Sequence, residues 1–188
     1  AVQHANARRA DDVVQALLRH GVQHVFVCPG SRSTPLVLAL ERADVAYHVL
    51  LDERVAGFAA LGAARAHAPA AVVTTSGTAV ANLLPALCEA GVDEIGWVAV
   101  TADRPRRLVG RGANQTLDQP PLLAGAVRTT VDLDAPGEAP AGADVDARAE
   151  LDAALAHLVG RSPGPVHLNI RFTKPLEPAA DYRSAPRD

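Results

Sequence analysis

Residues 24–36 read HVFVCPGSRSTPL, and this stretch decides the fold class. Residues 24–28 are short, apolar and rich in β-branched side chains, which is typical of a buried strand. Pro29-Gly30 marks a turn, and the Ser-Thr-Pro of residues 33–35 is a usual start of a helix. The stretch therefore predicts a buried strand that runs through a tight turn into a helix.

The alternation of strands and helices continues on both sides of this stretch. Upstream, one apolar stripe at helical spacing consists of Ala10, Val13, Val14, Leu17 and Leu18. Downstream, apolar runs predict strands at 45–51, 71–76, 97–103, 127–133 and 165–170. Helices are expected at 52–68, at 78–91 and along the stripe Leu151, Ala154, Leu155, Leu158 and Val159. The pattern predicts an α/β fold, a three-layer α/β/α domain with a mostly parallel six-stranded sheet.

The domain organisation follows from where this periodicity stops. Residues 1–174 are expected to form one domain of ordinary size. Residues 175–188 contain Pro and charge without periodicity, so we expect a linker to domains absent from this chain. Residues 134–144 are expected to form a loop. The absence of Met at position 1 also leads us to expect a piece of a longer protein.

Composition narrows the function classes. The net charge is −3, which argues against a nucleic-acid partner. No apolar run approaches the ~20 residues of a membrane helix, and the N-terminal stretch has no apolar signal core, so we expect no integral membrane segment and a cytoplasmic location. Cys28 and Cys88 have no disulfide or zinc spacing, and the seven His residues show no metal-ligand spacing, so no metal site is expected in this chain.

Polar residues follow four of the predicted strands. PGSRST (29–34) follows the first, Asp52-Glu53-Arg54 the second, TTSGTA (74–79) the third, and Asp103-Arg104, with Asn114-Gln115 further along, the fourth. Ligands bind beyond the carboxyl ends of strands in open parallel sheets, and a helix N-terminus favours an anion. The four groups are therefore predicted to converge on one binding site.

Each of these residues also has a purely structural interpretation. The hydroxyls near residue 31 could only cap a helix, and Arg32 or Arg104 could be solvated or paired with a carboxylate. Glu53 could simply compensate a helix dipole, and Asn114 and Gln115 could form turns. The small-sided helix after Glu53 could pack on its own sheet or form a dimer interface.

Five blocks taken together carry a resemblance to a known family. They are CPGSRSTPL (28–36), DERVAGFAALGAARA (52–66), TTSGTAVANLLPALCEA (74–90), TADRP (101–105) and GANQTLDQ (112–119). They resemble the N-terminal pyrimidine-binding domain of the 2-succinyl-5-enolpyruvyl-6-hydroxy-3-cyclohexene-1-carboxylate synthases, which are thiamine-diphosphate-dependent enzymes of menaquinone biosynthesis. Residues 91–100 and 134–144 depart from the family pattern.

The resemblance implies a thiamine-diphosphate-binding fold and one part of a transferase. Such an enzyme decarboxylates 2-oxoglutarate and adds the succinyl-semialdehyde carbanion to isochorismate. The cofactors would be thiamine diphosphate and Mg2+, and the metal ligands would lie outside this chain. The cofactor would sit between this domain and the diphosphate-binding domain of a second subunit, in a homodimer or homotetramer. The chain alone is then expected to be inactive.

The resemblance also implies roles for individual residues. Glu53 would be the catalytic residue, because a carboxyl group that shares a proton with the cofactor's pyrimidine can activate it. The cofactor-binding residues would be Glu53, Thr75, Ser76, Gly77 and Asn82. The substrate-binding residues would be Ser31, Arg32, Arg104, Asn114 and Gln115. Two alternatives stay open: another thiamine-diphosphate carboligase or decarboxylase domain, and a non-enzymatic regulatory α/β domain that binds an anion.

Overall fold

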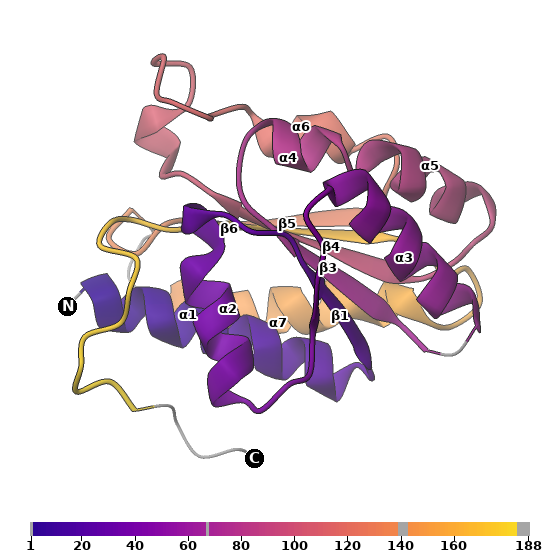
Figure 1. The fold of residues 1–188 in the computed structure, drawn as a ribbon, viewed down its shortest axis with the longest axis horizontal. Helices are drawn as coiled ribbons and strands as arrows, with labels where there is room; N and C mark the ends of the chain where they lie inside the picture. The colour runs from indigo at the N-terminus through magenta and orange to yellow at the C-terminus, as the bar shows by residue number, and fades with distance from the viewer. Residues whose placement is uncertain (1, 67, 139–142, 184–188) are drawn as a thin grey trace.

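The computed structural model confirms the three-layer α/β/α architecture (Figure 1). It describes residues 2–66, 68–138 and 143–183, without the side chains of 143–146. The sheet has six strands in the order β2-β1-β3-β4-β6-β5, and every neighbouring pair is parallel. The strands are β1 (His24–Val27), β2 (His48–Val49), β3 (Ala70–Thr74), β4 (Trp97–Asp103), β5 (Thr129–Leu133) and β6 (Val166–Arg171).

Helices cover both faces of the sheet. One layer contains α1 (Val2–Arg19), α2 (Thr34–Arg42) and α7 (Ala143–Leu155). The other contains α3 (Glu53–Ala66), α4 (Thr78–Ala81), α5 (Leu84–Val92) and α6 (Gln119–Leu123). Three short 3-10 turns are η1 (Ser31–Ser33), η2 (Arg106–Leu108) and η3 (Ala156–Leu158). Among the described residues, none of these helices has the length and apolar character needed to span a membrane.

The predicted strand at 45–51 is much shorter than expected. Only His48 and Val49 pair with β1, and both side chains are exposed. The preceding residues still complete the end of α2, since the Val45 amide donates to the carbonyl of Leu40 at 3.0 Å. Because β2 is an edge strand beside the short β1, the pairing ends after the hydrogen bond from the Leu50 amide to the Val27 carbonyl at 3.0 Å.

The predicted helix at 78–91 is broken into α4 and α5. Pro85 has no amide hydrogen, so it cannot bond to the carbonyl four residues earlier in a continuous helix. The chain instead makes a tighter turn, in which the Leu83 amide donates to Val80 at 3.1 Å. This break places Asn82 between the two helices, at the end of α4.

Smaller corrections concern the ends of other helices. The first helix begins at Val2, eight residues before Ala10, the first residue of the predicted stripe. Leu18 and Val159, which the sequence assigns to buried stripes, are 38% and 60% exposed. Part of the predicted loop at 134–144 lies outside the described residues.

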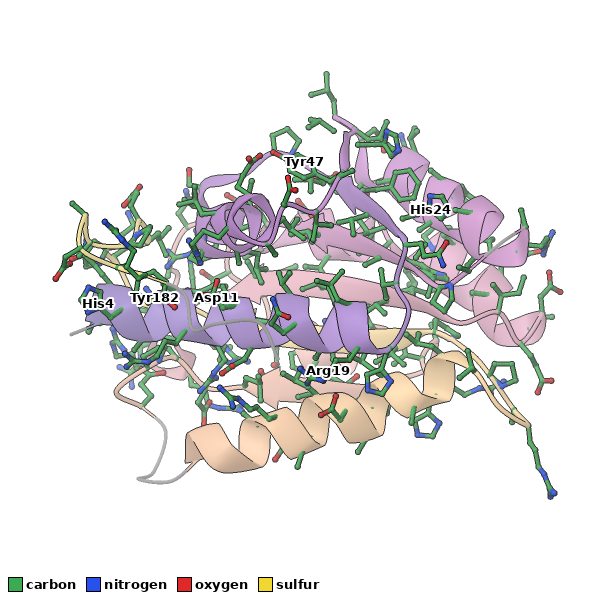
Figure 2. The ribbon with its side chains drawn as sticks, turned by 90° about the horizontal axis from the view of Figure 1, so that it is seen from below. His4, Asp11, Arg19, His24, Tyr47 and Tyr182 are labelled. Carbon is green, nitrogen blue, oxygen red and sulfur yellow. The ribbon has the colours of Figure 1, made fainter. Side chains whose placement is uncertain are left out.

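The chain after β6 runs back along α1. The Asn6 side chain donates to the carbonyl of Thr173 at 2.6 Å, and the Tyr182 hydroxyl donates to Asp11 at 2.7 Å. Figure 2 shows Tyr182 between His4 and Asp11, along the N-terminal half of this helix. The described part of the segment predicted to be a linker therefore packs against α1.

Candidate functional site

The site is built where the strand order reverses direction. The chain leaves β1 toward β2 on one side of the sheet, whereas β3 pairs with β1 on the other side. Ligands bind outside the carboxyl ends of the strands at such a point. The turn after β1 packs tightly on the turn after β3, because a Cβ at Gly30 would lie only 2.3 Å from Cβ of Thr75. Glycine is therefore required at position 30.

Ser76, Arg104 and Gln115 form one hydrogen-bonded group. The Arg104 guanidinium donates to the hydroxyl of Ser76 and, at 2.6 Å, to the carbonyl of Gln115. The Gln115 side chain donates to the Ser76 carbonyl at 2.9 Å, and the Ser76 hydroxyl donates back to the Gln115 carbonyl at 3.1 Å. Gln115 has a left-handed φ of 53°, which is uncommon for a residue with a side chain. The loops after β3 and β4 thus hold each other.

Arg32 reaches the same region from the end of β1. Its guanidinium donates to the carbonyl of Phe172, the first residue after β6, at 2.9 Å and is buried. Since β3 and β4 lie between β1 and β6, this side chain crosses the ends of the central strands. Burial, and then the positive charge of Arg104, lower the pKa of Arg32, and Asp103 opposes them.

Neither of these two arginines forms an ion pair within the described part of the chain. The carboxylate of Asp103, which acts on both, is held by Arg171 at 3.0 Å. Burial also lowers the pKa of Arg104. A buried cation in a protein is normally paired. Arg32 is buried, Arg104 beside it is half-buried, and neither has a carboxylate partner among the described residues, so the two guanidinium groups make a site suited to an anion.

Glu53 and Asn82 form a second group of site residues. Glu53 begins α3, is half-buried, and its Oε2 accepts a hydrogen bond from the Asn82 side chain at 3.2 Å. Cys28 lies close by, because burial and then the negative charge of Glu53 raise the pKa of the Cys28 thiol to about 12. The break between α4 and α5 is what brings Asn82 to this carboxylate.

Two of the predicted site residues show no such convergence. Ser31 and Asn114 are exposed, and within the described residues no side-chain hydrogen bond is formed by either. The contact that involves Asn114 is made by its carbonyl, which accepts from the Thr116 hydroxyl at 3.1 Å. The structure therefore brings together Glu53 with Asn82, and Arg32 with Arg104 and Gln115, but not these two.

A buried polar network beneath the site was not predicted. Gln119 and Asn169 are fully buried, and the Gln119 amide donates to Asn169 Oδ1 at 2.7 Å. The Asn169 amide donates to Asp103 at 3.0 Å and to Asp132 at 2.7 Å, and both carboxylates bind Arg171.

The two carboxylates of this network titrate differently. Burial raises the pKa of Asp103, although Asn169 and Arg171 oppose it. For Asp132 the bonds from Arg171 and Asn169 outweigh its burial and lower the pKa. The available sequence signal was the alternation of His167, Asn169 and Arg171 with apolar residues on one buried strand.

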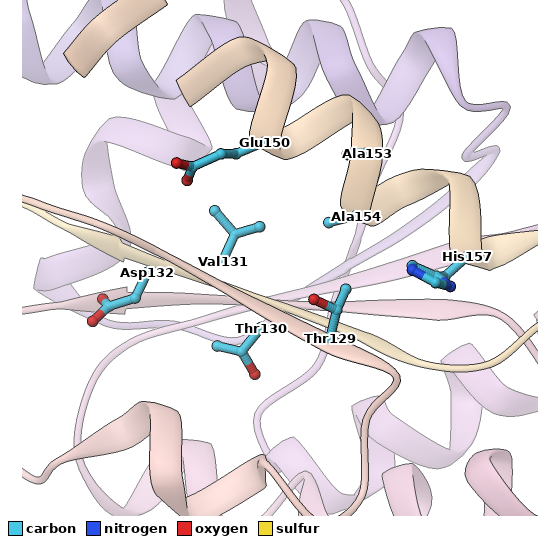
Figure 3. Close-up of a pocket in the computed structure, with 8 residues that line it drawn as sticks. All are labelled: Thr129, Thr130, Val131, Asp132, Glu150, Ala153, Ala154 and His157. Carbon is cyan, nitrogen blue, oxygen red and sulfur yellow. The ribbon is translucent and has the colours of Figure 1, made fainter. Parts of the chain in front are cut away.

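A separate groove lies at the edge of the sheet, between β5 and α7 (Figure 3). It is lined by Thr129, Thr130, Val131, Asp132, Glu150, Ala153, Ala154 and His157. Apart from Asp132 it shares no residue with the groups described above. Across the described ranges there is no cluster of three or more His, Cys, Asp or Glu that could hold a metal ion, and both cysteines are free.

Comparison with known proteins identifies the family. Residues 8–122 match the family described as "Thiamine pyrophosphate enzyme, N-terminal TPP binding domain". This range includes the turns after β1, β3 and β4, and both groups of site residues apart from Phe172. The chain belongs to this family, whose cofactor is thiamine diphosphate.

Similar full-length proteins carry one name. The chain is 52% identical over 179 residues to the 2-succinyl-5-enolpyruvyl-6-hydroxy-3-cyclohexene-1-carboxylate synthase of Renibacterium salmoninarum, covering 94% of this chain and 31% of that protein. It is 49% identical to the Halobacterium salinarum protein of the same name, covering 93% and 30%, and 45% identical to that of a Synechococcus strain, covering 96% and 32%. The chain thus spans about a third of the length of these relatives.

The residues present fit one part of a thiamine diphosphate site. Glu53 offers a half-buried carboxylate that is oriented by a single amide, and within the described residues its Oε1 accepts no hydrogen bond. A carboxyl group placed in this way can hydrogen-bond a pyrimidine ring nitrogen. Thr75 and Ser76 are buried, and Gly77 has a left-handed φ of 81° and no room for a side chain. Gln115 and Gln119 hold this turn by hydrogen bonds to the Ser76 carbonyl and from the Gly77 amide.

Proposed function

We propose that this chain is the pyrimidine-binding domain of a transferase that uses thiamine diphosphate, decarboxylates 2-oxoglutarate and adds the remaining four-carbon unit to isochorismate. The observation that carries the proposal is the pair Arg32 and Arg104, which lie together at the strand ends and form no ion pair with a carboxylate in the part of the chain that the structure describes. Within a family that binds thiamine diphosphate, such a pair calls for substrates that bring their own carboxylates. The names of the similar synthases support the same reaction.

On the cofactor side, the proposal assigns proton transfer to Glu53. When bound, thiamine diphosphate supplies a nucleophilic carbon and an electron sink for decarboxylation. Glu53 would share its proton with a ring nitrogen of the cofactor through Oε1, while Asn82 holds Oε2. Thr75, Ser76 and Gly77 would line the cofactor with main chain and small side chains.

On the substrate side, the proposal assigns carboxylate binding to the arginines. A guanidinium has five N–H donors in a planar fork that matches a carboxylate. Within the described residues the Arg32 side chain donates a single hydrogen bond, to the carbonyl of Phe172. Gln115, whose carbonyl accepts a hydrogen bond from Arg104, would donate through its side chain to the same substrates. Ser31 and Asn114 are exposed at the same edge and would reach the substrate only from outside this group.

The exposed apolar residues around Glu53 support a partner subunit. Val49, Leu51, Val55 and Phe58 are all at least half exposed, and Leu51 is 86% exposed. A cluster of this kind marks an interaction surface. The small face of α3 instead packs within the chain, since a Cβ at Gly57 would lie 3.0 Å from Cβ of Ala86 on α5.

The proposed partner is the diphosphate-binding domain of a second subunit, in a homodimer or homotetramer. That domain would hold the magnesium ion. Residues 175–188 would lead to the further domains of the same protein, and the proposal includes a cytoplasmic location.

The deciding experiment uses the full-length protein that carries this chain. Purified protein with thiamine diphosphate and magnesium should consume 2-oxoglutarate and isochorismate together and release CO2. Glu53→Gln keeps the shape of the side chain but cannot share the proton, so turnover should fall by about 10²–10⁴-fold. Glu89→Gln on the exposed face of α5 is the matched control and should keep full activity.

Each other outcome would point elsewhere. Consumption of 2-oxoglutarate without isochorismate would indicate a different decarboxylase or carboligase. A loss of less than about tenfold in Glu53→Gln, at unchanged thermal stability, would remove Glu53 from the proposed role. Binding of carboxylates without turnover would favour a regulatory domain.

A further inference from the structure

Gln119 connects the turn after β3 to the polar network under the site. Its Oε1 accepts from the Gly77 amide at 2.9 Å, and its Nε2 donates to Asn169 Oδ1 at 2.7 Å. Gln119 and Asn169 are both fully buried. The side chain therefore uses its acceptor on one loop and its donor on the network.

Asn169 leaves Gln119 only one usable orientation. Its amide nitrogen donates to the carboxylates of Asp103 and Asp132, which can only accept. Its oxygen must then face Gln119 and Thr101, and the Thr101 hydroxyl donates to it at 2.9 Å. With the donor end of Gln119 fixed on this oxygen, its acceptor end must face Gly77.

The same network holds the loop after β4. Arg171 is 1% exposed, pairs with Asp103 at 3.0 Å and donates to the main-chain carbonyl of Arg104 at 2.9 Å. The Arg104 amide donates to Asp103 at 2.7 Å. Main-chain groups of both Gly77 and Arg104 are thus anchored in one buried set of side chains.

We propose that Gln119 is a positioning residue, which fixes the Gly77 turn against the Arg104 loop and so sets the spacing of the cofactor and substrate halves of the site. Gly77 needs such an anchor, because its backbone is left-handed and a Cβ would lie 2.7 Å from Cγ of Gln115. If Gln119 no longer accepts from the Gly77 amide, this buried N–H is left without a partner and the turn relaxes. This inference rests on the proposed function only for its predicted effect on turnover and cofactor saturation.

The main variant is Gln119→Met, an unbranched side chain of similar length that makes neither hydrogen bond. In the full-length protein without cofactor, hydrogen exchange at the Gly77 amide should become at least about tenfold faster. In turnover, the half-saturating thiamine diphosphate concentration should rise about tenfold, with kcat at saturation changed by less than about threefold.

Thr101→Val is the matched control, because it removes bonds to Asn169 and His167 and the long contact at 3.4 Å from the Gln119 amide. It leaves in place the bond from the Gly77 amide to Gln119 and the bond from Gln119 to Asn169. It weakens the same buried network, so a merely structural role predicts the same changes in both variants. Positioning by Gln119 predicts faster exchange at Gly77 and weaker cofactor saturation in Gln119→Met alone.

Gln119→Glu supplies a second test through pH. The ionised carboxylate cannot donate to Asn169, whereas the protonated acid can both donate there and accept from Gly77. Relative to the unsubstituted protein at each pH, its cofactor saturation and Gly77 protection should recover as the pH falls from 8 to 6. This variant decides the matter if Gln119→Met does not fold.

Two results would overturn the proposal. One is exchange at Gly77 that is unchanged in Gln119→Met or equally fast in Thr101→Val. The other is a loss of kcat with unchanged cofactor saturation, which indicates a smaller folded fraction. If the full-length protein has no activity on 2-oxoglutarate and isochorismate, the proposed function fails, and exchange at Gly77 alone still tests Gln119.

Discussion

His167 should make the folded chain less stable in mild acid. It is fully buried on β6, its Nε2 lies 2.8 Å from the Thr101 hydroxyl, and within the described residues its Nδ1 has no hydrogen-bond partner. Burial lowers its pKa from 6.5 to about 4, although the negative charge of Asp132 opposes this. The neutral ring is therefore the form that the fold accepts.

The sign and size follow from proton linkage. Below pH 6.5 the unfolded chain binds a proton that the folded chain excludes, so stability is full above this pH and falls as the pH drops. The loss levels off below about pH 4, where the folded form also takes up the proton. The gap between the two pKa values corresponds to about 3 kcal/mol, of which about 2 kcal/mol should be lost by pH 5.

The assay is urea unfolding of the chain at pH 7 and pH 5, with and without His167→Gln. Glutamine can still bond to Thr101 but does not titrate, so the variant should lose about 2 kcal/mol less between the two pH values. His157→Gln, at an exposed histidine, is the control and should keep the pH dependence of the unsubstituted chain. Equal pH dependence in all three proteins would refute the reasoning, whatever their stability at pH 7.

Three further predictions concern the site. Gly77→Ala should cost about 1–3 kcal/mol in unfolding free energy, and more than Gly21→Ala, because both have a left-handed φ but only Gly77 has neighbours in the way of a Cβ; equal losses would contradict the crowding. Arg104→Lys keeps the charge but loses the planar fork, so the KM for isochorismate in the full-length protein should rise at least about tenfold while cofactor saturation stays unchanged. The isolated chain should show no stoichiometric, magnesium-dependent binding of thiamine diphosphate in calorimetry, and tight binding would contradict a site shared with another domain.

The sequence predicted the layers because the signals for them are local. The strand at 97–103 agrees with β4 at both ends, since it begins with four apolar residues, is buried on both faces and is bounded by Gly96 and Arg104. The strand at 45–51 and the helix at 78–91 were too long for different reasons. The strand is short because it lies at the edge of the sheet. The helix is broken by Pro85, an effect that the sequence alone could have predicted.

The sequence predicted which polar residues follow the ends of the strands, but not how these residues contact one another. That Arg32 and Arg104 meet depends on the order of β1, β3 and β4 in the sheet, which alternation of strands and helices does not fix. The bond between Glu53 and Asn82 depends on the break after α4. Local sequence therefore indicated which side chains face the site, but not which of them touch.

The role of Gln119 could not be predicted from the sequence, because its hydrogen-bond partners are far apart along the chain. Asn169 lies fifty residues away, on a strand whose neighbours are β4 and β5, and its contact with Gln119 exists only once β6 pairs between them. The residue itself stands in the block GANQTLDQ, beside two prolines that look like loop. Three-dimensional pairing, rather than local propensity, gives it a role.

The two faces of β4 explain why the network lies where the site is. Val98 and Val100 face α1 and α7 in an apolar core, whereas the opposite face changes from Trp97 and Ala99 to polar residues toward the carboxyl end. Buried polar groups are tolerated only when each finds a partner, and the short α6 supplies too few side chains to complete the set.

The remaining partners are main-chain groups of the loops that follow β3 and β4. The hydrogen bonds that complete the buried network are therefore the same bonds that fix the loops after β3 and β4. A substitution that leaves one of these polar groups unpaired should consequently loosen the loops at the strand ends before it loosens the apolar core on the other face of the sheet.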